Sequence, residues 1–343
     1  SRRSFPQYSP AGTAESTAEA LSSTESGAEN TAEKAEHITQ TLSSGVMVNA
    51  DVYVPESMQK SALAEMRGQG QLIDYEELKS LFCSGKTITE EGEEPWEMVT
   101  PGAMEAVGKY VSTQDGDYLQ RICGNTFYYM TERDIQDIED LTIYETGKNL
   151  DFASIEETDK TIRDIAEKLN IAVGKGVCYT IDTSSQPHYV FQYEILVNGM
   201  PLAMFDGGSY SGDAYVPGTY MTAVVDADGI RHYDVSYVLE ELESGESKKV
   251  LTLDEALQAV DDKYNSVIME GEYFIDDIQM AYTPVQTEET GIVRLIPVWY
   301  FQTTHQILVP NRSGTGKVML PQSGYILINA LDGTELLHSN GDI

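Results

Sequence analysis

The chain has 343 residues, of which 41% are hydrophobic and 23% charged, proportions typical of a globular protein with two or three domains. Its 22 Lys and Arg against 56 Asp and Glu give a formal net charge of −34, which all but excludes nucleic-acid binding through a basic patch and disfavours electrostatic attachment to anionic lipid. No apolar run reaches the ~20 residues that a membrane-spanning helix needs.

The first 45 residues are predicted to form a flexible acidic tether. From about Pro10 to Gly45 they are mainly Ala, Ser, Thr, Gly and Glu, and the sizeable apolar residues are only Leu21, Ile38 and Leu42. This apolar area is too small to offset an ordering cost of roughly 1–2 kcal/mol per residue. A nascent helix that frays is the alternative.

Residues 46–150 are predicted to form an N-terminal α+β region. Its first strand is marked by strict alternation and ends at Pro55; the residues on one face are Val46, Val48, Ala50, Val52 and Val54. Two helices, an acidic loop around Trp96 and a short strand follow, at about Ser61–Arg67, Tyr75–Cys83, Glu90–Thr100 and Asn125–Met130.

Residues 151–250 are predicted to be a helix-plus-sheet module. Ser154 and Glu157 have the spacing of a capping box, and an apolar stripe follows it until Gly174 and Gly176 end the helix: Ile162, Ile165, Ala166 and Leu169. The strands that follow are joined by an Asn198-Gly199 hairpin turn and by a turn at Asp226–Gly229. They are expected at Val177–Asp182, Tyr189–Val197, Pro201–Phe205, Tyr220–Val225 and Ile230–Leu239.

Residues 251–343 repeat this pattern. Thr252 and Glu255 form a second capping box, followed by an apolar stripe: Leu253, Ala256, Leu257, Val260, Tyr264 and Val267. Strands are expected at Tyr273–Thr283, Ile292–Thr303 and Tyr325–Leu331. Since a one-sided helix must bury its stripe against a sheet, the predicted fold class is α+β. It consists of tandem modules, each a helix packed on an antiparallel sheet, preceded by the tether.

The cysteine content leaves the redox state open. The three cysteines are Cys83, Cys123 and Cys178, and an odd number cannot form a complete disulfide framework. Either Cys83 pairs with Cys123, or all three are buried reduced thiols. Since no CxxC motif occurs, a structural zinc site has no signal.

The C-terminal module resembles the PepSY-like modules of bacterial extracytoplasmic proteins, in particular those of YycI/YycH-type regulators of sensor kinases. The resemblance is carried by the helix start at Leu251–Ala256, the strands Ile278–Tyr282 and Leu295–Phe301 with its Pro-Val-Trp, and the turn in Ile328–Thr334. The tether composition is similar to stalks of bacterial surface lipoproteins. These resemblances imply a binding or regulatory module outside the cell. It would be held at the surface by a lipid anchor upstream of this chain and would have an envelope protein or peptide as partner.

Catalytic motifs are incomplete. No HExxH or G-x-S-x-G motif occurs, and Ser57–Lys60 matches S-x-x-K without its companion motifs. Asp226–Gly229 has only the first half of a calcium loop, so a hairpin turn is favoured there. We therefore predict no catalytic residue, no cofactor and no metal site, although weak calcium binding stays open.

Aromatic residues offer a candidate binding surface, one in the predicted acidic loop and four in predicted strands: Trp96, Tyr189, Tyr193, Trp299 and Tyr300. The alternative, which we favour for the strand residues, is that they form the sheet core. The predicted function is a non-catalytic cell-surface binding or regulatory protein. A secreted hydrolase of envelope polymers with an unrecognised carboxylate pair is the second hypothesis, and a structural spacer the third. The oligomeric state is not indicated.

Overall fold

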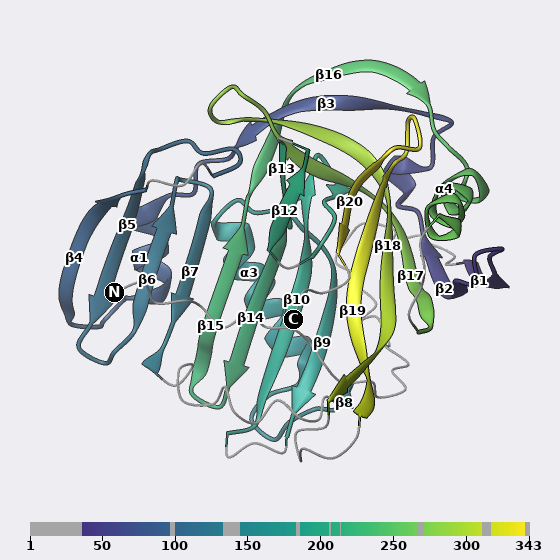
Figure 1. Cartoon of the computed structure of the whole chain (residues 1–343). Helices are drawn as coiled ribbons and strands as arrows, with labels where there is room; N and C mark the ends of the chain where they lie inside the picture. Colours follow the sequence, from purple (N-terminus) through teal and green to yellow (C-terminus); the bar gives the residue numbers. More distant parts are fainter. Residues whose placement is uncertain are drawn as a thin grey trace.

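The computed structural model describes residues 36–96, 100–132, 145–182, 186–205, 207–212, 214–266, 271–310 and 317–339. Residues 1–35 of the predicted tether and Val267 of the second stripe lie outside the described residues. Residues 36–45 form a strand and the turn after it. Two large β-sheets dominate the described part of the chain, and three α-helices pack on them (Figure 1).

Sheet A combines strands from both ends of the chain. Its order is β1 (Glu36–Thr41), β2 (Met47–Tyr53), β17 (Tyr273–Gln286), β18 (Ile292–Pro310), β19 (Lys317–Asn329) and β20 (Glu335–Ser339). The N-terminal half of β18 also pairs with β3 (Ala62–Gly70), which in turn pairs with β16 (Leu239–Lys249). Only the β2–β17 pair is parallel among the described pairs of this sheet. The predicted alternation in β2 is confirmed, because Val46, Val48, Ala50 and Val52 are buried.

Sheet B is built from the middle of the chain. Its order is β4 (Ile88–Pro95), β5 (Val107–Thr113), β6 (Tyr118–Ile122), β7 (Thr126–Met130), β15 (Gly229–Ser236), β14 (Tyr220–Asp226), β10 (His188–Val197), β9 (Val173–Ile181) and β8 (Glu145–Thr146). The short strand β11 (Met200–Pro201) folds back on β10 through the predicted turn, in which Asn198 and Gly199 both have positive φ. A separate hairpin follows, β12 (Gly208–Ser211) and β13 (Ala214–Pro217).

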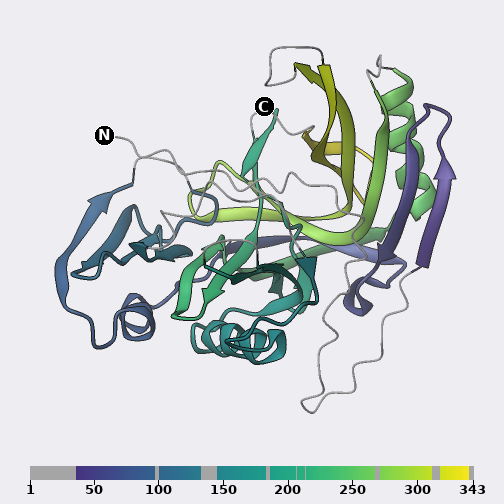
Figure 2. The ribbon, with the colours of Figure 1, turned by 90° about the horizontal axis from the view of Figure 1, so that it is seen from below.

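Helices cover one face of each sheet. The helices α1 (Tyr75–Phe82) and α3 (Ile155–Lys168) lie on the same face of sheet B, and α4 (Leu253–Asn265) packs on sheet A (Figures 1 and 2). The Phe82 ring of α1 stacks on Tyr129 of β7 at 4.8 Å between centroids. Both predicted capping boxes are confirmed, at Ser154–Glu157 and Thr252–Glu255.

The predicted fold class is wrong: the protein is predominantly β and is not a tandem of helix-on-sheet modules. The helix predicted at residues 61–67 does not form, since residues 62–67 lie in β3, and half of the predicted acidic loop is strand β4. Strands from the first 150 residues complete both sheets, so each sheet is much larger than one covering helix. The sheet in which a strand lies depends on pairing between distant segments, which local periodicity does not report.

The end of α3 also differs from the prediction. The helix ends at Lys168, and Asn170 takes the left-handed conformation with φ 57° just after it. Gly174 and Gly176 instead lie inside β9. Their Cβ positions are occupied by side chains of β10, because a Cβ on Gly176 would lie 2.6 Å from the Tyr193 ring.

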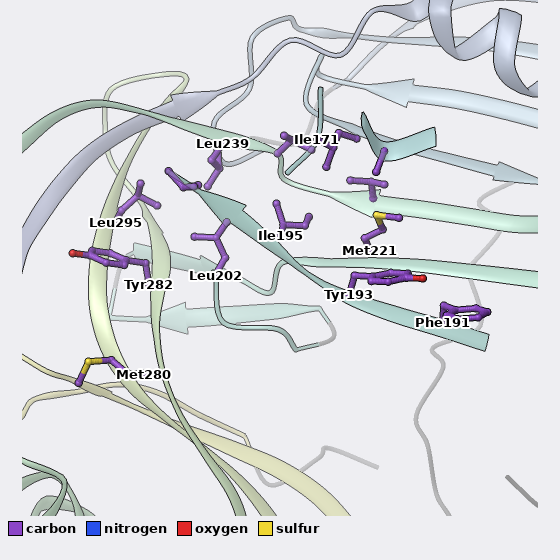
Figure 3. Close-up of a cluster of buried hydrophobic side chains, with 14 of the residues drawn as sticks. Ile171, Phe191, Tyr193, Ile195, Leu202, Met221, Leu239, Met280, Tyr282 and Leu295 are labelled. Carbon is purple, nitrogen blue, oxygen red and sulfur yellow. The ribbon is translucent and has the colours of Figure 1, made fainter. Parts of the chain in front are cut away.

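One continuous apolar core joins the two sheets. It runs from the helix-covered face of sheet B, with Phe191, Tyr193 and Ile195, to Tyr282 and Leu295 of sheet A (Figure 3). Between them the two sheets also meet through their backbones, since Leu202, directly after β11, forms an isolated parallel β-bridge with Tyr282 of β17. On the other face of sheet A, Phe205 and Val216 pack on Ala281, Val298 and Tyr300 in a second apolar cluster.

The three cysteines are free and buried, which confirms the thiol alternative and not the Cys83–Cys123 disulfide. Burial raises the pKa of each thiol, that of Cys178 to about 12. These residues therefore stay protonated and act as small apolar side chains. Within the described ranges, no helix combines the length and the apolar content needed to cross a bilayer.

Candidate binding surface

Four of the five sequence-predicted site residues lie in the interior. Tyr189 and Tyr193 are fully buried, and Trp299 and Tyr300 are each 4% exposed. The Trp299 indole N–H donates to the Leu251 carbonyl at 3.0 Å, and the Tyr300 hydroxyl donates to the Met204 carbonyl at 2.7 Å. These polar tips are satisfied inside the protein, so the four side chains serve as core.

Trp96 is different, because it lies at the border of a half-exposed aromatic surface. The Cβ position of Gly108 in β5 is 3.6 Å from Cε3 of the Trp96 ring. Gly108 shares a strand face with Tyr110, two residues further along β5. Trp96 is half-buried and follows β4 directly.

Three tyrosines continue this surface across neighbouring strands. Tyr110 of β5 and Tyr118 of β6 stack at 6.2 Å between ring centroids, and Tyr118 lies 5.8 Å from Tyr128 of β7. All three are half-buried, while their strand neighbours Val111, Leu119 and Phe127 are buried under the helices. We call Trp96, Tyr110, Tyr118 and Tyr128 the aromatic face. It lies on the side of sheet B that points away from α1 and α3.

A glycine in the edge strand leaves room for one of these rings. Gly92 of β4 pairs with Tyr110, and a Cβ there would lie 2.8 Å from the Tyr110 hydroxyl oxygen. A larger residue at 92 would push the ring away from the edge strand. The Tyr110 ring therefore reaches over β4, toward the acidic edge of the sheet.

Carboxylate and amide groups line the aromatic face. The Tyr110 hydroxyl donates to Glu90 at 3.1 Å, and the Tyr128 hydroxyl donates to Gln120 at 2.5 Å. The Gln120 amide in turn donates to Glu94 of the edge strand. On the next strand, Asp234 pairs in register with Tyr128 and accepts from the Tyr220 hydroxyl at 3.2 Å.

The aromatic face has carboxylates but no basic side chain from strands β4 to β7. None of the positions that β4 to β7 place on it is Lys or Arg, since Lys109 and Arg121 are on the helix-covered side. The hydrogen bond to Glu90 raises the pKa of Tyr110, and burial raises those of Tyr118 and Tyr128. The face therefore presents neutral phenol rings beside carboxylates, an arrangement that attracts cations.

The hydrolase hypothesis required a carboxylate pair in a deep cleft. Glu194 and Asp277 are two carboxylates that interact electrostatically where the sheets meet, but Glu194 is only 6% exposed. Two shallow hollows, of about 770 and 520 Å³, lie elsewhere, between β3, β16 and the β17–β18 turn and beside β1 and the start of α4. Neither is lined by this pair. No group of three or more His, Cys, Asp or Glu residues suited to a metal ion occurs among the described residues.

Sequence reasoning found only one member of the aromatic face. Tyr110, Tyr118 and Tyr128 lie on three different strands, and the pairing of Tyr110 with Gln120 and of Gln120 with Tyr128 places their strand faces together. A usable signal exists in each strand, since a tyrosine alternates with a buried aliphatic or aromatic neighbour. The register between strands is a tertiary property.

Comparison with known proteins shows the fold alone. No family model matches the chain, and no curated protein matches it. The chain is similar to a crystal structure of an uncharacterized protein from Eubacterium rectale, with 16% sequence identity and a TM-score of 0.69. The match covers 87% of this chain and 92% of that one.

Proposed function

We propose that this protein is a non-catalytic cell-surface binding protein that holds a basic, extended polypeptide segment on its aromatic face. The observation that carries the proposal is the row of Tyr110, Tyr118 and Tyr128 beside Glu90, Glu94 and Asp234, with no Lys or Arg from β4 to β7 on that side. The partner would be a peptide or a segment of an envelope protein.

Aromatic rings and carboxylates favour the same ligand groups. A Lys or Arg side chain over a tyrosine ring gains about 0.5–1 kcal/mol at an exposed site, and a nearby carboxylate adds a charge-assisted hydrogen bond. The net charge of −34 adds a long-range attraction that increases the association rate of a basic partner. An extended peptide suits this surface because its alternate side chains would reach rings on successive strands.

The surface location rests on the sequence. An acidic, Ala/Ser/Thr-rich N-terminal segment supports a tether that holds the body away from its attachment point. The similarity of the C-terminal segment to PepSY-like modules supports an extracytoplasmic role. Detection of the protein in the detergent-soluble envelope fraction, with radiolabelled fatty acid incorporated into the full-length precursor, tests this part separately.

Peptide binding is the direct test of the proposed function. Fluorescence anisotropy of a labelled nine-residue peptide with alternating Lys and Thr should show saturable binding that weakens as NaCl rises from about 50 to 300 mM. The double variant Y118A/Y128A should bind about tenfold more weakly, because two ring contacts of about 0.5–1 kcal/mol each are lost. W96F should remove the change in tryptophan emission that accompanies binding.

The matched control is Y210A, which truncates a tyrosine that is 69% exposed on the β12–β13 hairpin, outside the aromatic face. It should leave the affinity unchanged. Equal weakening by Y210A, or a preference for the corresponding Glu/Thr peptide, would contradict the proposal. Binding of neutral polysaccharide in place of the basic peptide would assign the face to glycans and would also overturn it.

A further inference from the structure

A carboxylate lies at the joint between the two sheets. Glu194 belongs to β10 of sheet B at an irregularity in its pairing with β9, where Tyr193 pairs with Gly176 and Ile195 with Val173. Two residues of β9, Gly174 and Lys175, thus stand opposite the single residue Glu194, which is a β-bulge. Bulges redirect side chains and free a backbone donor from the ladder.

The freed donor and a partner from the other sheet both point at this carboxyl group. The Lys175 backbone N–H donates to Oε2 of Glu194 at 3.2 Å, and the Gln279 side-chain amide of β17 donates to Oε1 at 2.6 Å. Gly174 leaves the space that the carboxyl fills, because a Cβ there would lie 2.8 Å from Oε2. The contact to Gln279 is a side-chain hydrogen bond that spans from sheet B to sheet A.

The surroundings oppose a charge at this position. Glu194 and Gln279 are each 6% exposed. The groups that face the carboxyl are the Lys175 ammonium from β9 and Asp277 from β17, with Asp51 of β2 interacting with Asp277 in turn. The Lys175 Nζ lies 5.3 Å from the Tyr53 ring centroid, so the ammonium group also makes a cation–π contact with that ring. Burial outweighs both donors and the lysine and raises the pKa of Glu194 to about 7.

We propose that Glu194 is a protonation switch at the sheet–sheet joint: the neutral carboxyl keeps sheets A and B closed on each other, and its ionisation loosens the joint. An ionised carboxylate gains hydration only when water reaches it. Water would reach Glu194 when β10 and β11 separate from β17. The continuous core on the other side of the joint then acts as the hinge.

The direction of the pKa shift of Glu194 fixes how opening of the joint depends on pH. The pKa of Glu194 in the folded protein lies above its ordinary value of 4.5. The stabilisation of the closed joint is therefore complete below about pH 4.5 and is lost as the pH rises through 7. If the open joint restores the ordinary pKa, the opening equilibrium constant should rise about tenfold between pH 6 and pH 8.

Hydrogen exchange measures this equilibrium directly. Amide exchange should be followed by mass spectrometry at pH 6 and pH 8, corrected for the intrinsic pH dependence of exchange. Peptides that contain Lys175, Ala203 and Tyr282 should show the tenfold increase in opening. Peptides from β5 and β6, far from the joint along sheet B, should not. In E194Q the increase should be absent, because the amide does not ionise.

Two further variants keep the test decisive. E167Q, at an exposed position of α3, should keep the wild-type pH dependence. Q279L removes a donor that favours the charged form, so the rise in opening should move to higher pH; this holds even if E194Q folds poorly. A tenfold rise that persists in E194Q would overturn the switch. So would an increase spread evenly over both sheets, because that would be global destabilisation.

Discussion

The hydroxyl groups of the core tyrosines and of the aromatic-face tyrosines have different hydrogen-bond partners. In the core, Tyr193 donates to Asp159 of α3 at 2.7 Å, and Tyr282 donates to the Ala64 carbonyl at 2.9 Å. On the aromatic face, Tyr110 and Tyr128 donate to Glu90 and Gln120 of their own sheet and keep one side of the ring accessible. These contacts satisfy hydroxyls that packing or the sheet holds in place, whereas the buried Tyr75 hydroxyl has no hydrogen-bond partner among the described residues.

Removal of one hydroxyl should distinguish the two groups. Y193F leaves the Asp159 carboxylate without its phenol donor, although Arg163 still pairs with it at 2.9 Å. We expect the free energy of unfolding to fall by about 1–2 kcal/mol, measured by urea denaturation. Y110F, which loses a hydroxyl at an exposed contact, should change it by less than about 0.5 kcal/mol. A larger loss for Y110F than for Y193F would contradict this assignment.

At the scale of single elements, local chemistry sets where helices begin. Ser154 accepts from the Glu157 N–H at 3.2 Å, and Glu157 accepts from the Ser154 N–H at 3.1 Å. Thr252 and Glu255 make the same reciprocal pair at the start of α4. These contacts span four residues, which is why the spacing alone predicted both helix starts.

Removing a cap should destabilise the protein by a predictable amount. S154A and T252A should each lower the free energy of unfolding by about 1 kcal/mol, because one helix N–H loses its acceptor. T161A, at an exposed position inside α3, serves as the control and should cause no loss. Chemical denaturation gives the three values. If T161A lowered stability as much as S154A, capping would not be the cause.

At the scale of the whole molecule, the net charge of −34 works against compactness. Several ion pairs among the described residues are exposed, and exposed pairs contribute little individually. The remaining carboxylates repel one another across both sheets. Stability of the folded state should therefore depend on how well the solvent screens this repulsion.

Salt should raise the melting temperature. Increasing NaCl from about 10 to about 150 mM shortens the Debye length from roughly 30 to roughly 8 Å, which weakens repulsion between distant carboxylates. We expect an increase of a few degrees by differential scanning calorimetry at pH 8. An equal osmolality of glycerol controls for effects unrelated to charge. A melting temperature that falls with salt would show that attractive ion pairs dominate instead.

The strands and helices that sequence patterns predicted correctly are those with a strong local signal. The alternation in β2, the Asn198-Gly199 turn and both capping boxes are confirmed because each depends on residues a few positions apart. The helix predicted at residues 61–67 is wrong because β3 is held by pairing with β16 and β18, and that tertiary environment outweighs local propensity.

The sequence by itself determined the caps, the turns, the buried strand faces and the charge, and it left the state of the three cysteines open between two alternatives. Only the tertiary structure decided that β2 pairs with β17, that three tyrosines form one surface with Trp96, and that Glu194 meets Gln279. The physical reason is range. Capping and alternation are fixed within one turn or one strand, whereas register and sheet order arise from contacts between segments far apart in the chain.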